Sequence, residues 1–186
     1  MDALAWALAQ NGVVLGVSER FIGPPLNIAL MAEGLSESAI ASVTSAYANR
    51  FLEVGLRRVH PFPSILDMVS CLYLKGMVQM IVSNRLQHIA VRIAEETGLS
   101  TFMQAVCGRN DQRETKVDVA TRALRNIEHI SSRTAVLVGD RAEDVETARI
   151  LGVASIAVSW GYALRGELQR ARAPIASSID CLNALL

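Results

Sequence analysis

The sequence has few cysteines, few aromatic residues and no long apolar run. Its three cysteines, Cys71, Cys107 and Cys181, lie far apart, without a Cys-x-x-Cys pair or a neighbouring histidine. That spacing argues against a disulfide framework and against a zinc site. Isolated cysteines in apolar surroundings are usually buried free thiols, so we expect a reducing compartment.

Neither sign of charge is in excess, since 18 lysines and arginines balance 18 aspartates and glutamates. Without a net field, binding to nucleic acid or to an anionic membrane surface is not expected. Charged residues or glycines interrupt every apolar stretch well before the roughly 18 residues that a membrane helix needs. The first twelve residues lack the basic start of a signal peptide. We therefore expect a cytoplasmic protein without nucleic-acid or membrane partners. Any anion site should be formed by a few neighbouring residues, not by the net charge of the chain.

What the sequence does have is a high apolar content, 51% of its 186 residues, enough for one compact core and a small second unit. Up to about residue 60, apolar residues recur at helical spacing in residues 2–10 and 36–56, and Ser36 is placed to cap the second helix. Between these helices, residues 20–26 form a turn that Gly-Pro-Pro makes rigid. We predict a helical domain over residues 1–60.

Residues 61–186 follow a different pattern, in which short apolar strands alternate with amphipathic helices. The expected strands cover residues 77–82, 103–107, 134–138 and 154–159, and the expected helices cover residues 64–74, 87–97, 115–130 and 143–151. Apolar strands that alternate with helices form a parallel sheet, covered by helices on both faces. We predict a doubly wound α/β core over residues 61–186.

Polar residues follow two of the expected strands, at the edge where ligands of parallel sheets bind. Ser83 and Asn84 come after the first strand, beside an expected helix N-terminus that suits an anion. Asp140 and Asp144 come after the third, four residues apart, and their carboxylate oxygens are the ligands that Mg²⁺ prefers. Lys116 opens the helix between them and brings a positive charge to the same edge.

Each of these residues also has an ordinary structural role. Ser83 alone is more often a helix cap, and Asp140 alone an N-cap. Asp144 alone fits a first-turn charge that the helix dipole favours, and Lys116 alone fits a solvated surface residue. Their order, each at the end of a strand or the start of a helix, favours a common site over four separate structural roles.

The sequence resembles the haloacid dehalogenase-like phosphatases in these same segments. Ile81-Val82-Ser83-Asn84, then Lys116, then the block from Leu137 to Val145 with its Gly-Asp-x-x-x-Asp are similar to the second, third and fourth motifs of that family. Residues 20–26 and 159–162 are similar to its phosphoglycolate phosphatase and 5'-nucleotidase-like branch. The resemblance implies an α/β fold, a three-layer Rossmann-like core with a parallel sheet, and a small helical cap over the site.

It also implies a Mg²⁺-dependent phosphatase that acts on a small phosphorylated metabolite through an aspartyl-phosphate intermediate. In that reaction Ser83 would hydrogen-bond the phosphoryl oxygens, and Lys116 would neutralise charge on the nucleophile and the transferred group. Asp140 would ligate Mg²⁺, and Asp144 would support the metal or position Lys116.

Two further residues are candidates for binding the substrate. By the resemblance, Asn84 would hold the phosphate through its backbone N–H group. Arg20, in the rigid turn of the helical region, is the candidate for contacting the leaving group, because caps in this family close over the site. The alternative for Arg20 is a solvated side chain on a turn that only packs the cap.

The family's first motif, a strand that ends in Asp-x-Asp-Gly-Thr and supplies the nucleophile, is missing from this sequence. Asp2 is followed by a helical pattern, with no strand before it. By resemblance the missing strand is the central one, between the strands at 77–82 and 134–138. We therefore expect a sheet without its central strand, impaired catalysis in this chain, and a Met1 that is an internal residue or a late start of a longer protein.

Two alternatives remain open. One is a non-catalytic relative that keeps Ser83, Lys116 and Asp140 to bind phosphate or metal, or a subunit that pairs with another chain. The other, a dehalogenase, is disfavoured because Asp140 with Asp144 suits a cation site. The sequence fits a monomer or a homodimer and does not identify the substrate.

Overall fold

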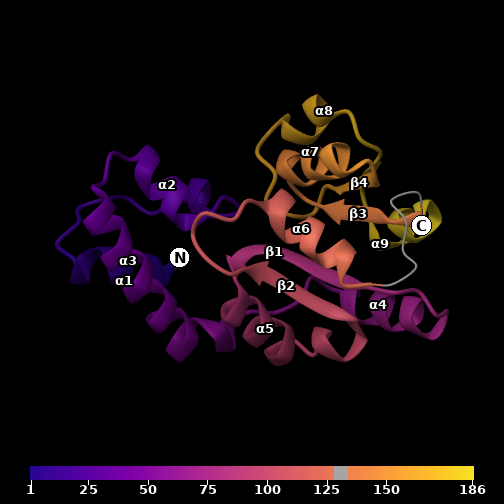
Figure 1. Ribbon diagram of the computed structural model, residues 1–186, viewed down its shortest axis with the longest axis horizontal. Coiled ribbons are helices and arrows are strands. Elements are labelled where there is room, and N and C mark those ends of the chain that lie inside the picture. Colours follow the sequence, from indigo (N-terminus) through magenta and orange to yellow (C-terminus); the bar gives the residue numbers. More distant parts are fainter. Residues whose placement is uncertain (128–133) are drawn as a thin grey trace.

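The computed structural model describes residues 1–127 and 134–186 and divides into a helical part and an α/β part (Figure 1). The helical part contains α1 (Asp2–Gln10), η1 (Glu19–Phe21), α2 (Leu26–Ala32) and α3 (Glu37–Arg50), followed by a π-helical turn η2 (Phe51–Gly55) and a 3₁₀ turn η3 (Leu56–Arg58). The helices predicted at 2–10 and 36–56 are confirmed, the second as α3 and the turns after it. Ser36 caps α3, because its Oγ accepts a hydrogen bond from the Ala39 amide (3.3 Å).

The helical part has an apolar core of its own. Leu8 of α1, Leu30 of α2 and Val43 of α3 are at most 1% exposed and pack together. A second cluster, in which Phe51 and Leu56 meet Ile89 of the α/β part, joins the two regions. The predicted boundary at residue 60 stays a prediction, although the last helical turn before the α/β part ends at Arg58.

The α/β part alternates strands and helices, as the sequence predicts. Its elements are α4 (Ile65–Leu74), β1 (Met80–Leu86), α5 (Gln87–Glu96), η4 (Leu99–Phe102), β2 (Ala105–Arg109), α6 (Lys116–Arg125), β3 (Val136–Gly139), α7 (Ala142–Leu151), β4 (Ala154–Val158), α8 (Glu167–Ala171), β5 (Ile175–Ala176) and α9 (Ile179–Leu185). All paired strands are parallel, with α5 and α6 packed on β1 and β2, and α7 on β3 and β4. No helix among the described residues is long and apolar enough to cross a membrane.

The strands form two sheets rather than one. β1 pairs with β2, and β3 pairs with β4, which pairs with β5. Between the two sheets β1 and β3 each have an edge that no described strand pairs with, at the place where the resemblance puts the missing strand. Val136 and Val138 of β3 are 37% and 40% exposed, unusually high for apolar residues in a parallel sheet. The gap between the two sheets therefore leaves apolar side chains of β3 partly exposed.

Three details of the sequence prediction are wrong. The first strand extends through Ser83 and Asn84 to Leu86, with an irregular register after Val82, so Ser83 does not stand at a helix N-terminus. Cys71 is exposed rather than buried, whereas Cys107 is buried. The C-terminal elements α8, β5 and α9 were not predicted, because their short apolar segments carry little periodicity. The end of the helix predicted over 115–130 lies partly outside the described residues.

Candidate functional site

Lys116 and Asp144 form an ion pair between the first turns of α6 and α7. A capping box fixes the start of α6, since the Asp118 amide donates to Thr115 Oγ1 (3.2 Å) and the Thr115 amide donates to Asp118 Oδ2 (2.8 Å). The ion pair is well shielded, because the side chains of Lys116 and Asp144 are 14% and 5% exposed. The sequence-predicted cation is therefore held at the carboxyl edge of the strands by a buried partner.

The other oxygen of Asp144 is occupied as well. Asp144 Oδ2 accepts a hydrogen bond from the Arg141 amide (3.0 Å), which closes the turn between β3 and α7. A Cβ at Gly139 would overlap the Asp144 carboxyl group, so the close approach of this carboxylate to the strand requires glycine there. With both oxygens bound, the geometry supports the positioning of Lys116 by Asp144, whereas metal binding by Asp144 stays a prediction.

Asp140 lies where β3 ends, facing the turn after β4. Its Oδ2 accepts a hydrogen bond from the Tyr162 amide (2.7 Å), and a Cβ at Gly161 would overlap its carboxyl group. Its Oδ1 accepts no hydrogen bond from the described residues. No group of three or more His, Cys, Asp or Glu side chains within residues 1–127 and 134–186 is arranged to hold a metal ion. Binding of Mg²⁺ by Asp140 therefore stays a prediction.

Ser83 and Asn84 reach the same edge from β1. Ser83 Oγ accepts a hydrogen bond from the Arg85 amide (3.1 Å), and Asn84 Nδ2 donates to Glu143 Oε2 (2.7 Å) at the start of α7. This second bond brings the end of β1 next to the turn that follows β3. The structure therefore gathers Ser83, Lys116, Asp140 and Asp144 at one edge, although only Lys116 and Asp144 are in direct contact.

Arg20 makes its contacts inside the helical part. Its guanidinium pairs with Glu33 (3.1 Å), donates to the Gly16 carbonyl (3.3 Å) and lies over the Phe21 ring (5.2 Å from the centroid). These contacts hold the Arg20 side chain within the helical part. Its contact with a leaving group stays a prediction.

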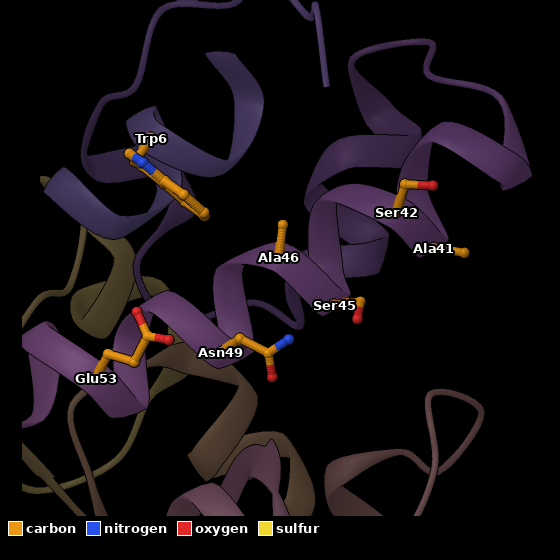
Figure 2. Close-up of a pocket in the computed structure, with 7 residues that line it drawn as sticks. All are labelled: Trp6, Ala41, Ser42, Ser45, Ala46, Asn49 and Glu53. Carbon is orange, nitrogen blue, oxygen red and sulfur yellow. The ribbon is translucent and has the colours of Figure 1, made fainter. Parts of the chain in front are cut away.

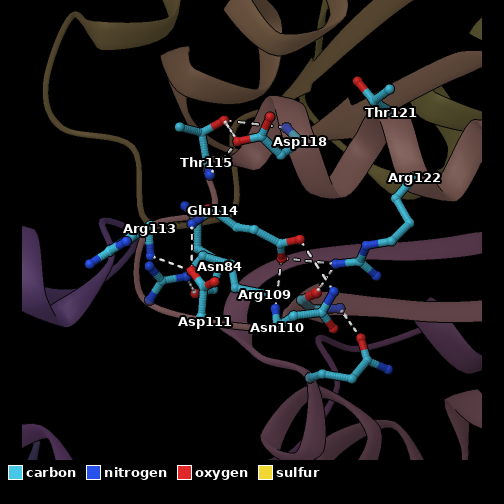
Figure 3. A network of polar contacts seen from close by, with 12 residues as sticks. Asn84, Arg109, Asn110, Asp111, Arg113, Glu114, Thr115, Asp118, Thr121 and Arg122 are labelled. Carbon is cyan, nitrogen blue, oxygen red and sulfur yellow. Dashed lines mark hydrogen bonds and ion pairs between the residues drawn. The ribbon is translucent and has the colours of Figure 1, made fainter.

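Three charged residues at this edge escaped the sequence analysis: Arg109, Arg141 and Glu167. Arg109 ends β2 and is only 5% exposed, and its Nε donates to the Asn84 carbonyl (2.7 Å), in the network that Figure 3 shows. Arg141 follows Asp140 and pairs with Glu167 Oε1 (2.9 Å). For Arg109 and Arg141 the position at the end of a strand was the available signal, whereas Glu167 begins α8 and follows no strand directly.

A shallow hollow on the helical part is lined only by α1, α3 and η2, with Trp6 above the small side chains of α3 (Figure 2). None of the residues predicted to take part in the reaction lines it.

The pKa of Glu167 is shifted by its surroundings at this edge. Burial acts to raise the pKa of Glu167, but bonds from the Arg141 side chain and the Ala142 and Leu164 amides outweigh it, and the pKa lies below its ordinary value. A carboxylate with a lowered folded-state pKa stabilises the fold above its ordinary pKa, and this contribution is lost as the pH falls through the lowered value.

We therefore expect the wild-type chain to lose more stability than Glu167→Gln when the pH is lowered from about 6 to about 3. Urea unfolding at a series of pH values measures the difference. Parallel pH profiles for the two proteins would show that folding does not lower the pKa of Glu167.

Comparison with known proteins matches the family model described as haloacid dehalogenase-like hydrolase to residues 16–158. The chain belongs to the haloacid dehalogenase-like hydrolase family. The predicted family and its α/β fold are thereby confirmed. Among solved structures, a predicted phosphatase from Clostridium acetobutylicum superimposes with a TM-score of 0.90 at 25% identity, over 99% of this chain and 88% of that one.

Its relatives in the family include phosphatases and a kinase. The tyrosine-protein kinase PtkA of Mycobacterium tuberculosis is 27% identical over 175 residues, which are 91% of this chain and 60% of the relative. A 5'-nucleotidase of Pseudomonas aeruginosa is 28% identical over 172 residues, 90% of this chain and 78% of the relative. A phosphoglycolate phosphatase of Aquifex aeolicus is 25% identical over 168 residues, 86% and 78%. The chain thus spans about 60% of the length of PtkA.

Proposed function

We propose that this chain supplies most of the active site of a Mg²⁺-dependent phosphatase that hydrolyses a small phosphomonoester. The observation that carries the proposal is the shielded Lys116–Asp144 pair, which lies at the same edge as Asp140 and Ser83. A positive charge held in a fixed place stabilises the charge that develops on a transferred phosphoryl group, without reorganising during the reaction. The 5'-nucleotidase and phosphoglycolate phosphatase relatives support this class of substrate.

In this proposal Lys116 faces the phosphoryl oxygens and Asp144 keeps it there. The Ser83 hydroxyl donates a hydrogen bond to a phosphoryl oxygen, and the Asn84 backbone amide donates another to the same group. Asp140 would hold Mg²⁺ through its carboxylate, which fits an ion that usually takes one or two protein carboxylates together with phosphate oxygens and water. When bound, Mg²⁺ neutralises charge on the phosphate.

The nucleophile in this proposal would be an aspartate on a further strand between β1 and β3. Its carboxylate oxygen would bond to phosphorus, and the bond from phosphorus to the ester oxygen would break, so that this oxygen leaves as an alcohol after taking a proton from water. A second water would then hydrolyse the acyl phosphate, which releases inorganic phosphate and regenerates the carboxylate. The two unpaired strand edges support this position. A second candidate is a phosphate-binding relative without catalysis, because residues 1–186 contain no Asp-x-Asp-Gly-Thr segment.

Hydrolysis of p-nitrophenyl phosphate with Mg²⁺ tests the proposal in three proteins: this chain, the chain with its in-frame upstream sequence, and that longer form with Asp140→Asn. We expect activity in the longer form alone, and a loss of at least about 100-fold with Asp140→Asn. A longer form that binds phosphate but hydrolyses nothing would instead support the non-catalytic candidate. Because one relative is a tyrosine-protein kinase, the same three proteins should also be incubated with ATP and a tyrosine-containing peptide, to test for phosphate transfer to the peptide.

A further inference from the structure

The turn of the helical part at Ile22 and Gly23 is bound by two side chains of the α/β part. Arg141 Nη1 donates to the Ile22 carbonyl (2.6 Å), and Asn84 Nδ2 donates to the Gly23 carbonyl (3.2 Å). Asn84 directly follows Ser83, and Arg141 directly follows Asp140. The two strand ends that carry predicted reaction residues therefore also bind the turn.

Carboxylates orient both donors. Glu143 accepts from Asn84, and Glu167 accepts from Arg141 Nε (2.9 Å) and from the Ala142 amide (2.7 Å). The side chains of Arg141 and Glu167 are 19% and 13% exposed, so this ion pair is shielded from water. A donor fixed in this way loses little conformational entropy when it binds a carbonyl.

A third contact joins the same two parts a few residues away. The buried Arg109 donates through Nε to the Asn84 carbonyl and reaches Asn27 Oδ1 of α2 (3.4 Å), while Asn27 Nδ2 donates to the Gln112 carbonyl (3.1 Å). Figure 3 shows Asn84 beside Arg109 in this network. Asn84 is thereby held from its backbone as well as from its side chain.

Gly23 leaves room for the guanidinium. Its φ is +105°, and a Cβ built on it would overlap Arg141 Nη1. Any larger residue would have to displace the arginine or lift the turn. Gly34, in the same helical part, has a φ of +81°, but a Cβ there meets nothing within 4 Å.

We propose that Arg141 and Asn84 are positioning residues that hold the turn at Ile22 and Gly23 against the edge carrying Ser83 and Asp140. These two side chains thus join the helical part directly to the ends of β1 and β3. The contacts exist whatever reaction the site performs, so the proposal does not depend on the proposed function.

Chymotrypsin cleavage after Phe21 reports release of this turn, because Phe21 is 9% exposed and must leave its cluster to be cut. We expect Arg141→Ala and Gly23→Ala each to speed this cleavage by about tenfold, as for loss of a hydrogen bond from a charged donor. Arg141→Lys should restore part of the protection, because a lysine also donates to the Ile22 carbonyl.

The matched controls are Gly34→Ala, which places alanine at a positive φ in open space, and Arg149→Gln, which removes an exposed arginine of α7. Both should cleave at the wild-type rate. In the Arg141→Ala background, Gly23→Ala should speed cleavage less than it does in the wild type, because only the strain of its positive φ then remains. The proposal is overturned if Arg141→Ala cleaves at the wild-type rate, or if Gly23→Ala acts equally with and without Arg141.

Urea unfolding of every variant separates local release from global unfolding. Arg141→Ala also removes the ion pair with Glu167, so the expected result is cleavage that rises by more than the loss of global stability accounts for. If instead cleavage rises only in proportion to the loss of global stability in both Arg141→Ala and Arg141→Lys, the two residues stabilise the fold without holding this turn.

Discussion

Replacing Lys116 with methionine is expected to lower kcat for p-nitrophenyl phosphate by about 100- to 1,000-fold in the catalytically active form of the protein. Methionine keeps most of the side-chain length and removes the charge. The loss should fall on kcat, because the ammonium group acts on charge that increases as the phosphoryl group is transferred.

Lys75 provides the matched control, since it is the only other lysine in the sequence and is exposed just after α4. Lys75→Met should leave kcat unchanged. A Lys116→Met protein whose kcat stays within about threefold of wild type would remove Lys116 from the reaction, because one positioned charge is expected to contribute far more.

The second large effect concerns stability. Asp144→Ala is expected to reduce the free energy of unfolding by about 3–5 kcal/mol, because it leaves the ammonium of Lys116 shielded and without its counter-charge. It also removes the acceptor of the Arg141 amide. Urea unfolding measures the change, and Lys116→Met combined with Asp144→Leu should recover part of the loss, since the unpaired charge is then gone.

Glu146→Ala is the control two residues further along α7. Glu146 pairs with Arg149, but their side chains are 54% and 71% exposed, so this solvated ion pair should contribute little to stability. Equal losses for Asp144→Ala and Glu146→Ala would mean that the Lys116–Asp144 pair is in effect solvated.

The sequence identified the parts of the site that lie within short segments. Lys116 at the start of α6 and Asp144 in the first turn of α7 could be predicted because helix starts and strand ends have local signals. The roles of Arg141 and Arg109 could not. Arg141 contacts Ile22 119 positions earlier in the chain, and no local periodicity encodes such a pair.

Strand limits were predicted less well than helices. β1 continues through Ser83, Asn84 and Arg85, residues with little intrinsic preference for strands, because pairing with β2 determines where it ends. The helix α1, by contrast, has the limits that the apolar spacing predicts, since its buried side chains recur at helical intervals. The end of β1 thus depends on pairing with a distant strand, whereas the limits of α1 depend on local amphipathicity.

The unpaired edges of β1 and β3 also affect how the chain behaves in concentrated solution. An exposed strand edge presents unused N–H and C=O groups to any extended segment, and the half-exposed Val136 and Val138 add apolar surface beside it. Natural proteins protect such edges with charges, bulges or covering elements, because edge-to-edge pairing leads to aggregates. A segment that pairs with these two edges, between β1 and β3, therefore also protects the protein against aggregation. This protection is separate from any part that the segment takes in the reaction.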